Sequence, residues 1–224
     1  MKRLRFLIML SLLTFCSSML NAQDNELKLG LRAGHNAAFG GFTAVSLETT
    51  QKCGPDFSVN AGLQYNTIGK TTLELHPEYH ILFDWGKFAV QAVGAYTHLG
   101  STNSLAFGAG LNVDSRVISG KLGYYYRLFG GRGGKITEPF NVYYEFCAHL
   151  LPNLEKWDLD LVITNCELFE LERHFQPSFI AEGSYFPKSN LGISFGLGCK
   201  PAGMFNMSAD YYQTYIKTGV CYRW

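Results

Sequence analysis

Apolar and polar residues alternate one by one through most of this 224-residue chain. The clearest segment is 57–66, where Phe57, Val59 and Leu63 share one face and Asn60 and Gln64 share the other. A period of two is that of a β-strand, because successive side chains point to opposite faces of a sheet. The chain is therefore predicted to be all β, with one apolar and one polar face on each strand.

The same alternation recurs along the chain, with turn-forming residues such as Gly54-Pro55 and Gly69-Lys70 between the segments. About twelve strands are predicted on this basis, with about ten or about fourteen as alternative counts. The predicted strands are 26–34, 42–50, 57–66, 72–83, 88–97, 105–114, 118–128, 140–150, 157–164, 175–185, 191–205 and 214–224. Pro77 cannot donate a ladder hydrogen bond, so a bulge or a local break is expected there.

The N-terminal segment has a different character. Three basic residues precede a short apolar run over residues 6–15. This is the pattern of a secretory signal peptide, and the run is too short to cross a bilayer. Cys16 raises a lipoprotein signal as an alternative, but Phe15 stands where such signals need a small residue. We therefore expect a signal peptide over residues 1–22 and a single β-barrel domain over residues 23–224.

Composition argues against several classes of function. Removing the three basic residues of the signal lowers Lys plus Arg from 19 to 16 against 18 Asp plus Glu, so the mature chain is near −2. That balance predicts no nucleic-acid partner and no polybasic membrane anchor. Five cysteines remain without CxxC spacing, so neither a disulfide framework nor a zinc site is indicated. The glycine-rich run 130–135 lacks the order of a phosphate-binding loop, and no cofactor is expected.

The strand pattern also predicts the surroundings of the protein. Successive hairpins without a linker favour an antiparallel meander. After the signal peptide, no run approaches the roughly 18 apolar residues of a membrane helix. In lipid, only a closed sheet lets strands satisfy every backbone group. Apolar rows of about ten residues match a tilted strand that crosses a bilayer. The predicted fold is a single antiparallel up-and-down transmembrane β-barrel.

The last segment, 214–224, ends the chain on an aromatic residue. Lys217, Gly219, Tyr222 and Trp224 fit the C-terminal assembly signal of bacterial outer-membrane β-barrel proteins. That signal is a polar residue, any residue, glycine, any two, a hydrophobic residue, any one, then a hydrophobic or aromatic residue. The mature chain thus resembles the porin-like small-barrel families. The resemblance implies the outer membrane of a Gram-negative (diderm) bacterium, with outer-membrane lipid and the barrel assembly machinery as partners.

An even number of strands places both ends of the barrel domain on one side, which the resemblance identifies as periplasmic. The turns after the even-numbered strands then lie on that side as well. Trp85, Trp157 and Trp224, which are all the tryptophans of the chain, fall at that rim. Indole favours the membrane interface because it has an apolar body and a polar N–H group.

Charges of both signs fall on the face predicted to line the lumen. The predicted lining residues are Arg32, Glu74, Glu78, Lys121, Arg127, Glu145, Asp158, Glu182, Lys200 and Arg223. They form either a polar network that fills the lumen or the lining of a pore, because about twelve strands lie between the closed and the open barrel sizes. Inward glycines, such as Gly110, Gly123 and Gly198, are expected to leave space inside.

No catalytic or metal-binding residues are predicted. His76 and His80 share one strand face but stand about 13 Å apart, too far to hold one ion. Asp158 and Asp160 resemble the acidic pair of outer-membrane aspartyl proteases, but no other feature supports that activity. The predicted function is a non-enzymatic outer-membrane protein, structural or porin-like, with passive passage of small solutes. The alternatives are an outer-membrane enzyme or a ligand-binding surface barrel that uses loops near residues 130–138 and 165–173.

Overall fold

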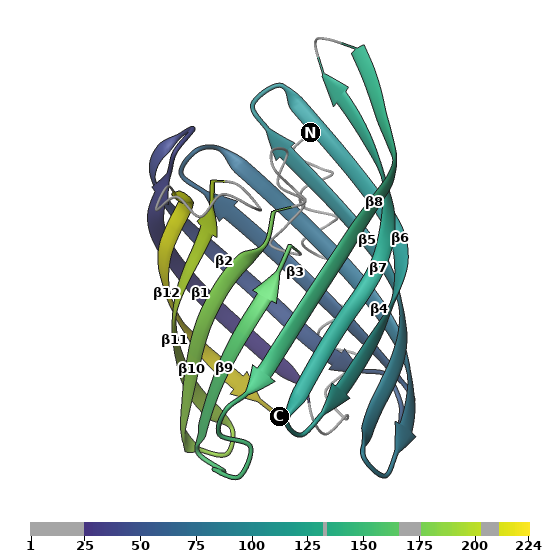
Figure 1. Ribbon diagram of the computed structural model, residues 1–224, viewed down its shortest axis with the longest axis vertical. Coiled ribbons are helices and arrows are strands. Elements are labelled where there is room, and N and C mark those ends of the chain that lie inside the picture. The colour runs from purple at the N-terminus through teal and green to yellow at the C-terminus, as the bar shows by residue number, and fades with distance from the viewer. Residues whose placement is uncertain (1–24, 132–133, 166–175, 203–210) are drawn as a thin grey trace.

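The computed structural model describes residues 25–131, 134–165, 176–202 and 211–224. These residues form a closed antiparallel barrel in which each strand pairs with its sequence neighbours and the last strand pairs with the first (Figure 1). The strands are β1 (Glu26–Asn36), β2 (Gly40–Lys52), β3 (Phe57–Asn66), β4 (Lys70–Phe83), β5 (Gly86–Leu99), β6 (Thr102–Ser115), β7 (Ile118–Gly131), β8 (Gly134–His149), β9 (Trp157–Thr164), β10 (Ser178–Lys188), β11 (Leu191–Pro201) and β12 (Tyr211–Arg223). The predicted fold class and the count of twelve strands are confirmed. The predicted signal peptide lies outside the described residues.

Two strand ends differ from the prediction by more than three residues. The stretch 134–139, expected in a surface loop, is the start of β8, because Phe129 pairs with Ile136 and Gly131 lies opposite Gly134. Figure 1 shows this β7–β8 hairpin projecting beyond the other strands at the end opposite the C-terminus. The other difference is β11, which ends at Pro201 instead of continuing to about residue 205. Its ladder shifts just before this proline, which has no N–H group to continue it.

Pro77 produces the expected local break. On one side, β3 pairs with β4 without interruption, and Val59 lies opposite Pro77. On the other side, the β4–β5 pairing runs from Leu75 opposite Gly94 directly to Glu78 opposite Gln91. The two residue numbers of a pair add up to the same value before and after the gap. The register is therefore unchanged, and no bulge forms.

The two faces of the wall are inverted relative to a water-soluble protein. Large apolar side chains cover the outside along every strand, as Leu29, Phe107 and Leu197 illustrate with exposed fractions of 54%, 50% and 62%. The side chains buried inside include many polar ones, such as Gln91 and Thr97. This arrangement is stable where hydrocarbon surrounds the barrel. In the described part of the chain, no helix has the length and apolarity needed to span a membrane.

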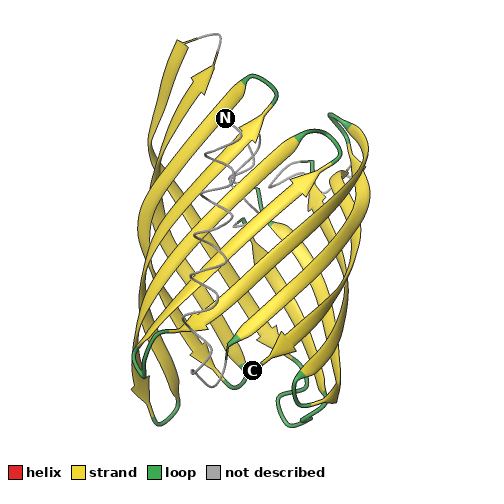
Figure 2. Cartoon of the chain, turned by 180° about the vertical axis from the view of Figure 1, so that it is seen from behind, coloured by secondary structure: helices red, strands yellow, loops and turns green. Residues whose placement is uncertain are grey.

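All three tryptophans lie at one end of the barrel. Trp85 is in the β4–β5 turn, Trp157 begins β9 and Trp224 follows β12. Backbone hydrogen bonds between Trp224 and Asn25 close the seam of the barrel at this end. Figure 2 shows the C-terminus among the turns of this rim. The predicted common rim is confirmed, and its identification as the periplasmic rim stays a prediction.

The contact between β8 and β9 is the shortest ladder among the described residues, with five pairs from Glu145 opposite Thr164 to His149 opposite Asp160. Asn165 lies just beyond it. Its side-chain oxygen accepts a hydrogen bond from the Tyr144 N–H at 2.7 Å, and its side-chain nitrogen donates to the Val142 carbonyl at 2.9 Å. The amide thereby supplies the donor and acceptor that a further strand residue would offer to β8.

Candidate functional site: the charged interior

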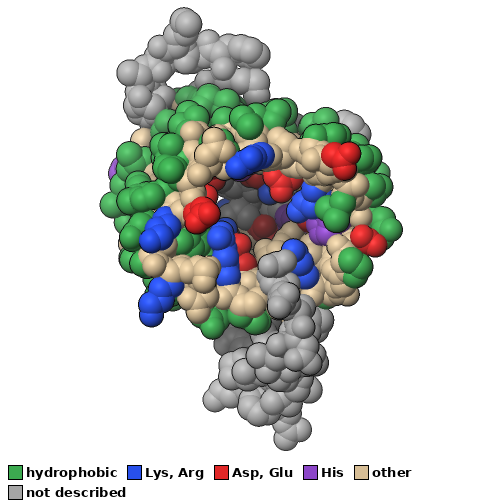
Figure 3. All heavy atoms as spheres, turned by 90° about the horizontal axis from the view of Figure 1, so that it is seen from below, with side chains coloured by type: hydrophobic (Ala, Val, Ile, Leu, Met, Phe, Trp, Pro, Cys, Tyr) green, Lys and Arg blue, Asp and Glu red, His purple; other side chains and the backbone are tan. Residues whose placement is uncertain are grey.

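Seen from the end that carries the C-terminus, acidic and basic side chains surround a central hollow (Figure 3). Hydrophobic side chains form the outer rim in the same view. The strand alternation places the charged residues of the predicted lining on the interior face of the wall. Most of them belong to ion pairs between strands, to side chains stacked on aromatic rings or to a buried hydrogen-bond network.

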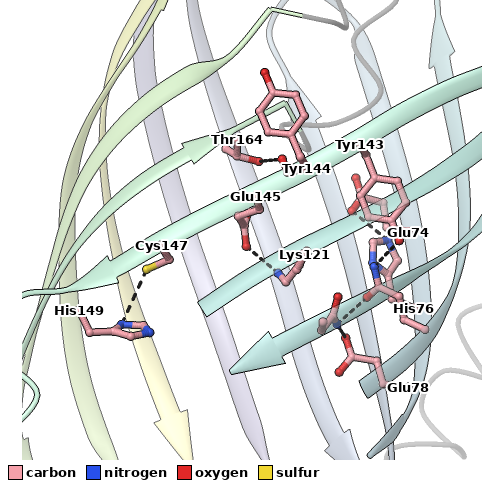
Figure 4. Close-up of polar contacts among 12 residues, drawn as sticks. Glu74, His76, Glu78, Lys121, Tyr143, Tyr144, Glu145, Cys147, His149 and Thr164 are labelled. Carbon is pink, nitrogen blue, oxygen red and sulfur yellow. Dashed lines mark hydrogen bonds and ion pairs between the residues drawn. The ribbon is translucent and has the colours of Figure 1, made fainter. Parts of the chain in front are cut away.

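Among the ion pairs that join different strands in the described residues, two connect a lysine to a glutamate. Lys121 on β7 and Glu145 on β8 lie directly opposite each other in the ladder, and their charged atoms are 2.7 Å apart (Figure 4). Lys217 on β12 reaches Glu182 on β10 across the intervening strand β11. Gly196 on β11 makes this reach possible, because a Cβ there would stand only 2.8 Å from the Lys217 side chain. Each pair neutralises opposite charges along the wall.

A buried polar network ties together the strands from β4 to β8. The Asn112 amide donates to Glu78 and to Gln91, at 2.9 Å in each case. Gln91 in turn donates to the Tyr143 hydroxyl at 2.6 Å. The network therefore joins the interior faces of β4, β5, β6 and β8.

Arg127 lies flat against the wall beside this network. Its side chain is fully buried, and its guanidinium donates to the Tyr125 hydroxyl at 3.1 Å. The same guanidinium stacks within 5.4 Å of the Phe129 ring centroid. Cation–π contacts of this kind hold a charge close to the sheet. Arg127 therefore contributes to the wall rather than to the free space of the lumen.

Aromatic rings cover several inward glycines, contrary to the expectation that these glycines leave empty space. A Cβ on Gly198 would meet the Tyr215 ring at 2.1 Å, and a Cβ on Gly123 would meet the Tyr143 ring at 2.4 Å. The reason is that a glycine lets a neighbouring ring lie flat on the backbone. The ring occupies the space that a side chain at the glycine would fill. It therefore does not project into the lumen.

We expect Gly198→Ala to destabilise the barrel by about 1–3 kcal/mol, because the new methyl group displaces the Tyr215 ring. Gly62→Ala is the matched control, since a Cβ at this inward position would meet no atom closer than 3.9 Å. Urea unfolding of the lipid-refolded barrel measures both variants. Equal stability of the two would mean that Tyr215 does not rest on Gly198.

The remaining predicted lining residues lie in different surroundings. Arg32 stacks over the Tyr215 ring at 4.3 Å, and Arg223 stacks over the Phe186 ring at 4.0 Å. Lys200 is buried, with an exposed fraction of 3%. Glu74 lies 3.6 Å from His76 on the same strand. Asp158 is exposed near the start of β9.

The four residues that fit the assembly signal lie along β12 and just after it. Lys217 faces inward to Glu182, and Gly219 lies opposite Gly30 of β1. Tyr222 and Trp224 face outward, and their rings stack with centroids 5.8 Å apart. The rings thus form an aromatic pair on the outer surface of the seam. Recognition by the assembly machinery stays a prediction.

Sequence reasoning missed the buried polar network of Gln91, Asn112 and Tyr143. The alternation assigns all three to the interior face, so that signal was present. Their mutual contacts depend on which strands are neighbours and in which register. Because the three side chains carry no charge, they were not predicted as site residues. The predicted lining therefore contained the charges but not the neutral groups that position them.

Several known structures are similar in fold to this chain. The KdgM porin in complex with disordered oligogalacturonate superimposes with a TM-score of 0.55 at 11% identity, over 89% of this chain and 99% of that one. The NanC porin gives 0.56 at 11% identity, over 88% and 100%. The translocator domain of autotransporter NalP from Neisseria meningitidis gives 0.56 at 11% identity, over 93% and 92%. No family model and no curated protein matches the chain.

These similarities show that this chain shares its barrel fold with the KdgM and NanC porins. The predicted resemblance to porin-like small barrels is confirmed at that level. One of the two structures named as porins is a complex with disordered oligogalacturonate.

Proposed function

We propose that this protein is an integral outer-membrane channel that lets small polar solutes pass through its interior by diffusion. The observation that carries the proposal is that large inward side chains lie against the wall. Tyr215 and Tyr143 lie over glycines, Arg127 lies over aromatic rings, and Lys217 is folded back onto Glu182. Side chains held against the wall favour an axis open to water in a barrel whose size lies between the closed and the open ones.

The chemistry of the lining favours weak selectivity between ions. Basic and acidic groups both line the wall, and several of them form ion pairs, as Lys121 does with Glu145. Paired charges give a small net field along the axis, so neither sign of ion is strongly enriched. The proposed solutes are accordingly small polar molecules and ions of either sign. Outer-membrane lipid and the barrel assembly machinery are the other proposed partners.

The proposed role is non-enzymatic. Asp158 and Asp160, considered above as an acidic pair, have different surroundings. Asp160 is hydrogen-bonded to His149 at 2.8 Å, while Asp158 is exposed. Two carboxylates that act together share a proton at close range. These different surroundings therefore argue against a protease site formed by these two residues.

Lumen charges provide the test of the channel proposal. In planar bilayers under a salt gradient, Lys121→Gln is expected to shift the reversal potential toward cation preference, and Glu145→Gln toward anion preference, because each leaves its partner uncompensated. Glu155→Gln is the control, since Glu155 is exposed in the turn between β8 and β9 and not on the lumen wall. Identical reversal potentials in all of these variants would contradict passage along this wall.

A further inference from the structure

Three different metal-binding side chains meet on the interior wall where β8 joins β9. Cys147 and His149 are alternate residues of β8 and share its inward face (Figure 4). Asp160 of β9 lies directly opposite His149 in the ladder. The Nδ1 atom of His149 is 2.8 Å from Oδ1 of Asp160 and 3.7 Å from Sγ of Cys147. One ligand atom from each residue falls within 4.8 Å of the other two.

This geometry differs from that of a thiol nucleophile activated by histidine. In such a relay, one ring nitrogen takes the thiol proton and the other is held by the carboxylate. Here the sulfur and the carboxylate oxygen both approach Nδ1 of His149. Three atoms converge on one point, as ligands of a single ion do. A thiolate, an imidazole and a carboxylate together suit a tetrahedral Zn²⁺ ion.

The surroundings of the three residues provide space and a favourable charge. A cavity of about 300 Å³ adjoins them, with His149, Asp158 and Asp160 in its lining. It has room for water or a further ligand at the fourth position of a tetrahedral ion. The Asp158 carboxylate adds negative charge to the same cavity.

The nearby basic groups are engaged elsewhere. Lys121 pairs with Glu145, and Lys217 pairs with Glu182. The Nε atom of Arg116, which also lines the cavity, donates to the Pro152 carbonyl at 3.4 Å. The two ion pairs offset the lysine charges and so reduce the repulsion that a cation would meet at the cluster of Cys147, His149 and Asp160.

We propose that Cys147, His149 and Asp160 bind a divalent transition-metal ion of the Zn²⁺ type. Binding releases the thiol proton of Cys147 to solvent and moves the imidazole proton of the neutral His149 ring from Nδ1 to Nε2. Coordination through the ion then replaces the direct contact between His149 and Asp160. The ion would join β8 to β9 at the shortest ladder among the described residues. This site is separate from the proposed channel activity, which does not require it.

Cobalt(II) binding to untagged, chelator-treated barrel in detergent tests the site. The background protein lacks the signal peptide and has Cys53, Cys166, Cys199 and Cys221 replaced by serine, which leaves Cys147 as the single thiol. We expect a sulfur-to-cobalt charge-transfer band that saturates at one ion per chain and disappears when Zn²⁺ is added. Cys147→Ser should abolish the band. His149→Ala and Asp160→Asn should each weaken binding by at least about tenfold, the smallest loss typical of an outer-shell partner.

Gel mobility before and after boiling shows that each variant is a folded barrel. His98→Ala serves as a matched histidine control, because His98 bonds to Asn103 on a different part of the wall. Absence of the charge-transfer band in the folded single-thiol protein would overturn the proposal. Unchanged cobalt affinity in both His149→Ala and Asp160→Asn would also overturn it, because the thiol alone would then account for binding.

Discussion

Leu197→Arg is expected to destabilise the lipid-refolded barrel by about 2–4 kcal/mol, the cost of an arginine on the lipid face near the midplane. Leu197 lies in the middle of β11, between Ala181 of β10 and Ile216 of β12, and its side chain is 62% exposed on the outer surface. Hydrocarbon cannot solvate a guanidinium group there. Equilibrium unfolding in urea, with the barrel refolded in lipid vesicles, measures the loss.

Ser194→Arg is the matched control on the same strand. Ser194 has the opposite facing and lies between Ser184 and Gly219 on the interior wall. An arginine there can extend into water, so its cost should be much smaller. Equal costs for the two variants, or the reverse order, would show that the assignment of faces on β11 is wrong, because a shift of one residue exchanges them.

Deletion of Tyr222 to Trp224 is expected to reduce insertion into the outer membrane severely. The deletion removes the pairing of Tyr222 with Leu27 and with Leu191, so it shortens both ladders of β12. It also removes the backbone hydrogen bonds between Trp224 and Asn25 and the two aromatic positions of the assembly signal. Fractionation of a Gram-negative host, with gel mobility as the folding readout, measures insertion.

Trp224→Phe is the control for chain length, because it keeps the full length of the chain and an aromatic residue at the last position. We expect this variant to insert nearly as well as the parent protein. Normal insertion of the deletion variant would show that the match of Lys217, Gly219, Tyr222 and Trp224 to the signal is coincidental. Failure of both variants would assign the effect to the indole ring rather than to the signal pattern.

Much of the fold was predictable because the alternation of side chains is a local property. Residues 57–66 and 157–164 were predicted with the bounds that β3 and β9 have. The alternation also sorted Leu197 and Ser194 onto opposite faces. Antiparallel order followed from the short turns, and closure followed from the need to satisfy the backbone in lipid. No long-range information was required for any of these steps.

The interior was less predictable because its contacts depend on register between strands. Nothing in the spacing of Cys147, His149 and Asp160 indicates that they meet, since the ladder between β8 and β9 brings them together. The placement of Tyr215 over Gly198 also depends on the register between strands. Because of it, a ring covers this inward glycine, where empty space was expected. The start of β8 was missed because the glycines around residue 134 hide the alternation that would mark a strand.

Single-channel recording in planar bilayers tests the central claim most directly. The sample is the purified mature barrel, refolded in detergent and shown to be closed by its faster gel mobility before boiling. We predict small, discrete conductance steps with little preference between cations and anions, because the lining charges are paired and the rings and Arg127 lie against the wall. A closed barrel that inserts into the bilayer but passes no current would contradict the account.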